Sequence, residues 1–158
     1  MSEKQQVALE TVKRYMWLSG AAGLVPVPLA DLIAVSGVQL KMLADISKIY
    51  DFPFQASRGK MVIGSLMGYV LPRALSFGVL GSLIKGIPVV GVLAGEPAMA
   101  LFSAASAWAL GSVFIQHFES GGTFLNFDPG AVKEYYRTQF EAGQKMAANV
   151  KTEAKARA

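Results

Sequence analysis

Residues 24–37 read LVPVPLADLIAVSG, an apolar stretch that carries two prolines and an aspartate at its middle. A proline has no backbone N–H and its ring clashes with the preceding turn, so a helix entering this stretch must stop before Pro26. A new helix then begins around residues 29–32, where Asp31 accepts hydrogen bonds from the free N–H groups and suits the helix dipole. The stretch therefore predicts the tip of a helical hairpin over residues 15–50. Its interaction candidates are Pro26, Pro28 and Asp31.

Both arms of this hairpin carry helical patterns. Ser2 and Gln5 have the S-x-x-Q spacing of a capping box at the start of the first arm. The second arm is apolar at first and amphipathic later, with Lys41 and Lys48 on its polar side, and it ends near Tyr50. We therefore expect two helices that meet at the proline-rich tip.

Residues 61–116 form an apolar region that contains few charged residues, namely Arg73, Lys85 and Glu96. The pattern predicts a short helix ended by Pro72-Arg73, an apolar segment over 74–95 kinked by Pro88, a tight turn at Glu96-Pro97 and an uncharged helix over 97–116. The last of these has the roughly 20 residues that a helix needs to cross a bilayer. Small residues recur at four-residue spacing, which lets helices approach closely and favours self-association. Examples are Gly64/Gly68, Gly91/Gly95, Ala100/Ala104 and Ala107/Gly111.

The last part of the chain begins with a loop over residues 117–130, HFESGGTFLNFDPG. Asp128 and Pro129 are typical of an N-cap followed by the first residue of a helix. An amphipathic helix is predicted over 128–150, and the short basic tail 151–158 is expected to fray. No strand pattern occurs, so the whole 158-residue chain is predicted to be a single all-α domain.

Composition excludes several classes of function. Fifteen Lys and Arg against eleven Asp and Glu give a net charge of only +4, too diffuse for a nucleic-acid-binding surface. The absence of cysteine and the single histidine, His117, exclude thiolate and multi-histidine metal sites. No phosphate-binding loop or G-x-S-x-G motif is present, and His117 and Glu119 would point to different faces of a helix. We expect no enzymatic activity and no cofactor.

Two stretches, GLVPVPLADLIAVSGVQLKMLADISKIYDF and ALGSVFIQHFESGGTFLNFD, resemble a small bacterial domain family of unknown function that accompanies GTPases. Its members include YcjF-like membrane proteins and the C-terminal domains of Era-like GTPases. The matching residues are Pro26, Pro28 and Asp31 at the tip, Gln39 and Met42 after it, and Phe118 to Gly121 in the late loop. The resemblance implies a helical, membrane-associated protein with a possible GTPase partner, which would supply any nucleotide chemistry.

Two interpretations of the apolar region compete. In the first, residues 74–116 form a transmembrane hairpin with Glu96 at its outer tip, and cationic residues before it keep both termini in the cytoplasm of a bacterial inner membrane. The first hairpin would dip into one leaflet, with Arg14 and Lys41 anchoring its two arms on the same side. In the second, the chain is a cytoplasmic bundle in which helix 97–116 is buried on every side.

The function predicted from these patterns is that of a non-enzymatic, membrane-associated helical protein. It would contact membrane lipid, form a homo-oligomer and act as a scaffold or accessory partner to a cytoplasmic GTPase. The candidate residues are Pro26, Pro28, Asp31, Gln39, Lys85, Phe118, Gly121 and Gly122. Lys85 is either functional or a residue that extends its charge to water. The alternatives are a soluble lipid- or peptide-binding module, or an oligomeric pore lined by Lys85 and by Ser103, Ser106 or Ser112.

Overall fold

The computed structural model describes the backbone of residues 2–22, 28–77, 88–123 and 126–157. Side chains are described for the same residues except 21–22, 28–35, 71–77, 88–101 and 148–157. This part of the chain is helical and has no strand: its elements are α1 (Glu3–Ala22), α2 (Pro28–Ile49), α3 (Ala56–Phe77), α5 (Pro88–Glu119), the short 3-10 helix η1 (Pro129–Val132) and α6 (Lys133–Arg157). The predicted all-α fold is confirmed.

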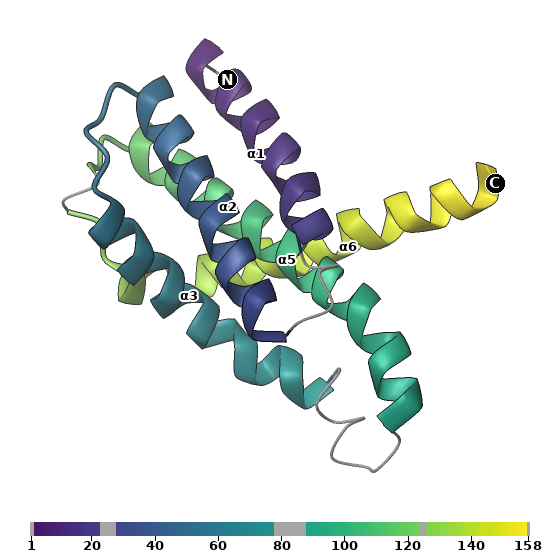
Figure 1. Ribbon diagram of the computed structural model, residues 1–158. Helices are drawn as coiled ribbons and strands as arrows, with labels where there is room; N and C mark the ends of the chain where they lie inside the picture. Colours follow the sequence, from purple (N-terminus) through teal and green to yellow (C-terminus); the bar gives the residue numbers. More distant parts are fainter. Residues whose placement is uncertain (1, 23–27, 78–87, 124–125, 158) are drawn as a thin grey trace.

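The central helix of the bundle is α5, which packs extensively against α1 and α6 and also contacts α2 and α3. Because α1, α2 and α3 alternate in direction, α1 and α3 end where α2 and α5 begin, at the lower right of Figure 1. We call this end of the bundle the apolar end. It consists of residues 15–22, 28–30, 74–77 and 88–95, none of which is charged.

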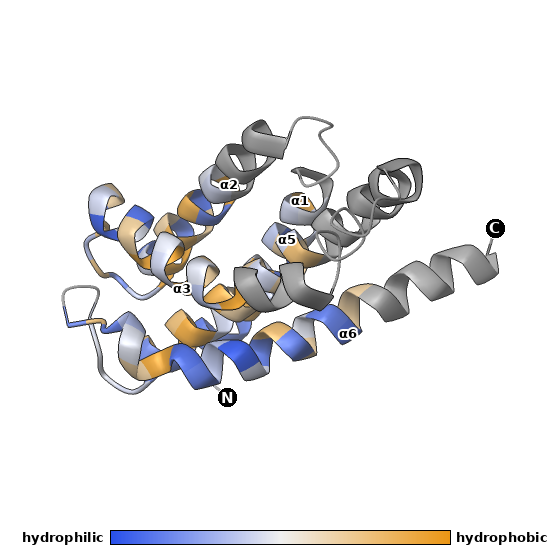
Figure 2. Cartoon of the chain, turned by 90° about the horizontal axis from the view of Figure 1, so that it is seen from below, coloured by the Kyte–Doolittle hydropathy of each residue, from blue (hydrophilic) through white to orange (hydrophobic). Residues whose placement is uncertain are grey.

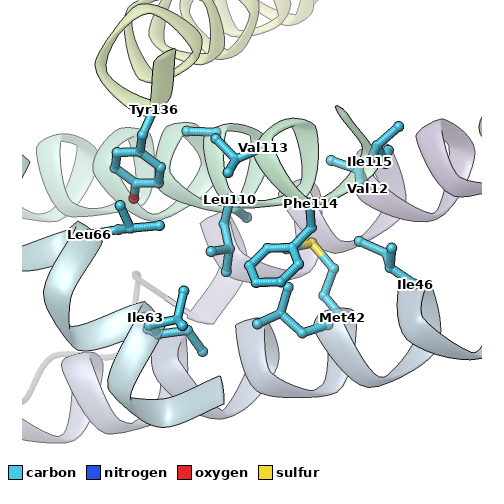
Figure 3. Packing of buried hydrophobic residues seen from close by; sticks show 14 of the residues in the cluster. Val12, Met42, Ile46, Ile63, Leu66, Leu110, Val113, Phe114, Ile115 and Tyr136 are labelled. Carbon is cyan, nitrogen blue, oxygen red and sulfur yellow. The ribbon is translucent and has the colours of Figure 1, made fainter. Parts of the chain in front are cut away.

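The hydrophobic core surrounds α5, and every other helix contributes to it (Figure 3). Its largest buried side chains include Val12 from α1, Met42 and Ile46 from α2, Leu66 from α3, Leu110 and Phe114 from α5, and Tyr136 from α6. Residues 102–115 of α5 are buried except for Trp108, which is half-buried. In Figure 2 the apolar residues face inward, and polar residues follow the outer side of α6. The described part of the predicted helix 97–116 is thus the centre of a bundle.

Two glycines allow α5 to lie unusually close to its neighbours. A Cβ atom at Gly111 would lie 2.7 Å from Cγ1 and 3.0 Å from Cβ of Val12 on α1. A Cβ atom at Gly143 on α6 would lie 2.9 Å from the Cα atom of Ala105. Gly64 and Gly68 on α3 differ, because a Cβ atom at either position would meet nothing within 4 Å.

Several predicted helix ends are confirmed. The Gln5 backbone N–H donates to Ser2 Oγ at 3.1 Å, which caps α1. α1 ends at Ala22, before the prolines, and α2 ends at Ile49, close to the predicted end. Asp128 caps the last helical segment by accepting from the Gly130 N–H at 3.0 Å.

The start of α2 corrects the predicted role of Asp31. The helix begins at Pro28, because proline fits the first helical position, where its missing N–H would have no partner in any case. Asp31 is therefore the fourth residue of α2 rather than the residue before it, and the predicted N-cap is wrong. A carboxylate in the first turn still suits the helix dipole.

At Pro72 and Pro97 the predicted helix end and turn do not occur. α3 continues through Pro72 and Arg73 to Phe77, and α5 begins at Pro88 and continues through Glu96 and Pro97. The predicted turn at Glu96-Pro97 is therefore wrong. The kink predicted at Pro88 also involves residues 78–87, which lie outside the described part of the chain. A proline removes one backbone hydrogen bond, and the flanking turns of a long helix can keep the others. α6 likewise extends to Arg157, so the tail 151–157 is helical rather than frayed.

The predicted hairpin over residues 74–116 does not have its tip at Glu96. Residues 88–116 belong to a single helix, with Glu96 in its interior. None of the helices in the described ranges has both the length and the apolar character needed to cross a bilayer. Residues 78–87, which include Lys85, lie outside the described part of the chain.

Candidate functional site

The eight residues singled out in the sequence fall in different parts of the molecule. Pro26 and Lys85 lie outside the described residues. Pro28 begins α2 at the apolar end and Asp31 follows directly after that end, and the side chains of both residues are not described. Gln39 lies in the core, and the structure brings together Phe118, Gly121 and Gly122 at the C-terminal end of α5. We call the last region the loop corner; it comprises residues 117–123, residues 126–127 and the neighbouring residues 50–52.

The chain leaves α5 through a Schellman motif, the six-residue turn that commonly ends a helix with a left-handed residue. The Gly122 N–H donates to the His117 carbonyl at 2.9 Å, and the Gly121 N–H donates to the Phe118 carbonyl at 3.1 Å. Gly121 has a φ of +87°, a conformation that other residues adopt only with strain. The loop predicted over residues 117–130 begins later than expected, because α5 continues to Glu119. Gly121 is required at this turn for its backbone conformation.

His117 fastens the following loop to the end of α5. Its Nε2 atom lies 2.7 Å from the Thr123 carbonyl oxygen and 3.0 Å from Asn126 Oδ1. Both partners are acceptors, so Nε2 carries the proton and donates to them. Asn126 Oδ1 also accepts from the Thr123 N–H at 2.8 Å. These contacts make His117 a hydrogen-bonded polar end to the apolar helix α5.

Gly122 leaves the space that the His117 ring occupies, which leads to a first prediction. A Cβ atom at Gly122 would lie 2.7 Å from His117 Nδ1 and closer still to two other ring atoms. Gly122→Ala should displace the ring, break its bonds to Thr123 and Asn126, and lower the free energy of unfolding by about 1 kcal/mol in urea titrations.

The neighbouring glycine provides the control for this experiment. Gly121→Ala is strained by its φ whatever stands at residue 117, because nothing lies within 4 Å of its Cβ position. The effect of Gly122→Ala should therefore shrink in a His117→Ala background, whereas that of Gly121→Ala should persist. Equal effects of Gly122→Ala in both backgrounds would contradict the proposed clash.

Aromatic rings fill the space beneath the loop corner. The Phe118 ring centroid lies 4.8 Å from that of Phe52 and 5.4 Å from that of Tyr50, both from the end of α2. Phe114 stacks on Phe127 at 4.3 Å and thereby holds the residue that precedes the Asp128 cap. Phe118 is consequently buried and acts as an anchor for packing rather than as a surface residue.

Glu119 ties three helix ends together, a role that the sequence did not reveal. Its Oε1 atom accepts from Ser2 Oγ and from the Tyr50 hydroxyl, each at 2.7 Å. The bonds from Ser2 and Tyr50 hold the pKa of Glu119 below its usual value. Burial, and then the Glu119 carboxylate, raise the pKa of Tyr50. Beside them Lys4 pairs with Asp51 at 2.8 Å, so the start of α1 meets the ends of α2 and α5 at one corner.

Gln39 belongs to a second polar group, which is buried between α2, α5 and α6. Its Nε2 donates to Ser106 Oγ, while its Oε1 atom has no protein partner. The Tyr136 hydroxyl is also buried without a partner, and burial raises its pKa, with nearby Ser106 acting in the opposite direction. Ser103 Oγ, Ser112 Oγ and Trp108 Nε1 are likewise unpartnered. The three serines proposed to line a pore are thus all buried inside one chain.

The hydrogen bonds and the ion pair of the loop corner hold the start of α1, the end of α2 and the end of α5 together. Among the described side chains, no group of three His, Asp or Glu residues is placed to bind a metal ion. His117 and Glu119 point to different partners, as expected for residues two apart on a helix. The geometry therefore defines a helical bundle with a tightly fastened polar corner and an opposite end at which the described residues 15–22, 28–30, 74–77 and 88–95 carry no charge.

Comparison with known proteins places this bundle in a class of helical domains without an assigned activity. The chain belongs to the family described as domain of unknown function (DUF697), whose model matches residues 1–145. It is also 40% identical over 152 residues to magnetosome membrane protein 22 of Magnetospirillum gryphiswaldense, a match that covers 96% of this chain and 78% of that protein. No solved structure matches the chain. The sequence-based assignment to a family of unknown function is confirmed, and its link to GTPases stays a prediction.

Proposed function

We propose that this chain is a non-enzymatic, membrane-associated scaffold that contacts a bilayer through its apolar end and offers its polar loop corner to a cytoplasmic partner. The observation that carries the proposal is the meeting of four uncharged helix segments at one end of the bundle. The similarity to a protein named as a magnetosome membrane protein supports the same conclusion. The location that follows is the bacterial inner membrane, with the termini in the cytoplasm.

Fractionation of the untagged protein from its native host tests this proposal. The protein should stay in the membrane pellet after alkaline carbonate washing and should require detergent for release. Recovery as a defined species in the soluble fraction would contradict membrane association and favour the soluble binding module.

The proposed partner is a GTPase, and its support is the resemblance of residues 23–52 and 109–128 to a family found with Era-like GTPases. The experiment is co-purification from detergent-solubilised membranes, with GDP or a non-hydrolysable GTP analogue present throughout. An Era-like GTPase should be retained in one nucleotide state more than in the other. Its absence in both states would overturn this part of the proposal without affecting membrane association.

Self-association is also proposed, supported by the small-residue spacing of the sequence. The pair Ala107/Gly111 packs within the chain: Ala107 is buried and Gly111 lies against Val12 of α1. Gly64 and Gly68 are exposed on α3. Sedimentation velocity of the detergent-solubilised protein should show a species larger than the 16.8 kDa chain, and a monomer at all concentrations would contradict it.

A further inference from the structure

The outer face of α1 carries large apolar side chains directly beside cations. Trp17 and Leu18 are 46% and 49% exposed, which is high for side chains of their size. Lys13 and Arg14, one turn earlier on the same face, are exposed as well. α1 buries its other face, so these four residues form a continuous outer patch, which we call the α1 patch.

Lys13 and Arg14 of α1 lie near a cation of α2, Lys41, because Tyr15 and Lys41 both contact Asp45. The Tyr15 hydroxyl donates to Asp45, whose other carboxylate oxygen lies 3.1 Å from Lys41 Nζ. Burial raises the pKa of Asp45, but the bonds from Tyr15 and Lys41 outweigh it, so the pKa lies below its usual value and the carboxylate stays charged. The three cations Lys13, Arg14 and Lys41 outnumber the two nearby carboxylates, Asp45 and Glu10 (three minus two gives +1).

The α1 patch also lies at a boundary along the helix. On one side of it are Glu10 and the charged residues of the polar half of α1. From Tyr15 to Ala22, a stretch that includes Trp17 and Leu18 and belongs to the apolar end, α1 carries no charge. Tryptophan is enriched at the level of membrane headgroups, where its ring spans apolar and polar surroundings. Lysine and arginine beside it can place their stems along apolar surface and their charges among phosphates.

We propose that the α1 patch binds anionic phospholipid, with Trp17 and Leu18 inserted at the membrane interface and Lys13, Arg14 and Lys41 against the phosphate groups. This inference rests on the proposed membrane association and adds to it the class of lipid and the binding face. An anionic bilayer fits the patch better than a second copy does, because two such patches would bring like charges together. Each cation near an anionic surface strengthens binding by about fivefold.

The test uses the full-length Trp108→Phe protein, in which Trp17 is the remaining tryptophan. Trp17 emission should shift to the blue, and be protected from a soluble quencher, on addition of vesicles containing phosphatidylglycerol but not of pure phosphatidylcholine vesicles. The double variant Lys13→Gln/Arg14→Gln should bind the anionic vesicles about 25-fold more weakly, and added salt should weaken the parent protein in the same direction.

Matched controls come from α3, which lies on the opposite side of α2 from α1 in Figure 1. Lys60→Gln removes an exposed cation and Met61→Gln an exposed apolar side chain, and neither should change vesicle affinity by more than about twofold. Circular dichroism of each variant checks that the fold is kept.

Four results would overturn the inference. Unchanged affinity in Lys13→Gln/Arg14→Gln, or an unshifted Trp17 spectrum in vesicle-bound protein, would reject this face while leaving membrane association intact. A Trp17 shift that depends on protein concentration without vesicles would assign the patch to self-association. Absence of binding to every vesicle, together with a soluble protein in cell fractions, would reject both the inference and the proposed function.

Discussion

Replacing Gly111 with alanine is expected to lower the free energy of unfolding by about 2 to 3 kcal/mol. The new methyl group would lie 2.7 Å from Cγ1 and 3.0 Å from Cβ of Val12, and closer still to Cγ2. Valine has two branches at Cβ and one strongly preferred rotamer in a helix, so it has no free rotation to make room. α1 would have to move away from α5, although alanine itself favours the helix by about 1 kcal/mol over glycine.

A double-mutant cycle tests whether contact with Val12 is the cause. Val12→Ala alone removes two buried methyl groups and should cost about 2 kcal/mol. In Gly111→Ala/Val12→Ala the added methyl enters the vacated space, so the double variant should be no less stable than Val12→Ala alone. The coupling would then be about 2 kcal/mol in urea unfolding.

Gly64→Ala and Gly68→Ala are the controls, because both glycines lie in a helix and have open space at the Cβ position. Each should raise stability by about 0.5 to 1 kcal/mol through helix propensity. If Gly111→Ala were stabilising like these two, or additive with Val12→Ala, the close approach of α1 and α5 would be wrong.

The features of the fold that the sequence predicted correctly are those set by residues close together in the chain. The Ser2 and Asp128 caps and the amphipathic character of α6, which buries Tyr136 and Phe140, were predicted correctly, because each depends on neighbours within a turn or two. Proline was the main source of error. At Pro72 and Pro97 its local cost predicts an end, but the helices continue, since an unfavourable residue can be outweighed by the packing of a long helix.

In the loop corner too, the roles of residues that depend on distant parts of the chain could not be predicted from the sequence. The sequence indicated a loop over residues 117–130 with Gly121 and Gly122 as candidate residues, but the need for glycine at residue 122 comes from the position of the His117 ring. Glu119 had no predicted role because its partners, Ser2 and Tyr50, are 117 and 69 residues away in the chain. A capping serine and a helix-end tyrosine are common, and no local pattern indicates that they share a carboxylate.

The largest effect of pH is expected from a substitution at Gln39. Its side chain is fully buried, and its Oε1 atom has no protein partner. Gln39→Glu keeps the shape but places a carboxyl group where burial disfavours the charged form, so its pKa in the folded protein should rise well above the value of about 4.3 in the unfolded chain. A raised folded-state pKa means that stability is kept below about pH 4 and lost as pH rises toward that pKa.

At 1.36 kcal/mol per pKa unit, Gln39→Glu should lose about 3 to 4 kcal/mol between pH 4 and pH 7, relative to the parent protein. The measurement is urea unfolding at several pH values, plotted as the difference between variant and parent so that other groups cancel. Gln39→Met, which has similar volume and no charge, should differ from the parent by about 1 kcal/mol or less at every pH, because it gives up the bond to Ser106 but also removes an unpartnered oxygen. A flat difference curve for Gln39→Glu would mean that the polar group at Ser106 and Tyr136 stabilises a charge, and the expected rise in the pKa of the new carboxyl group would then be wrong.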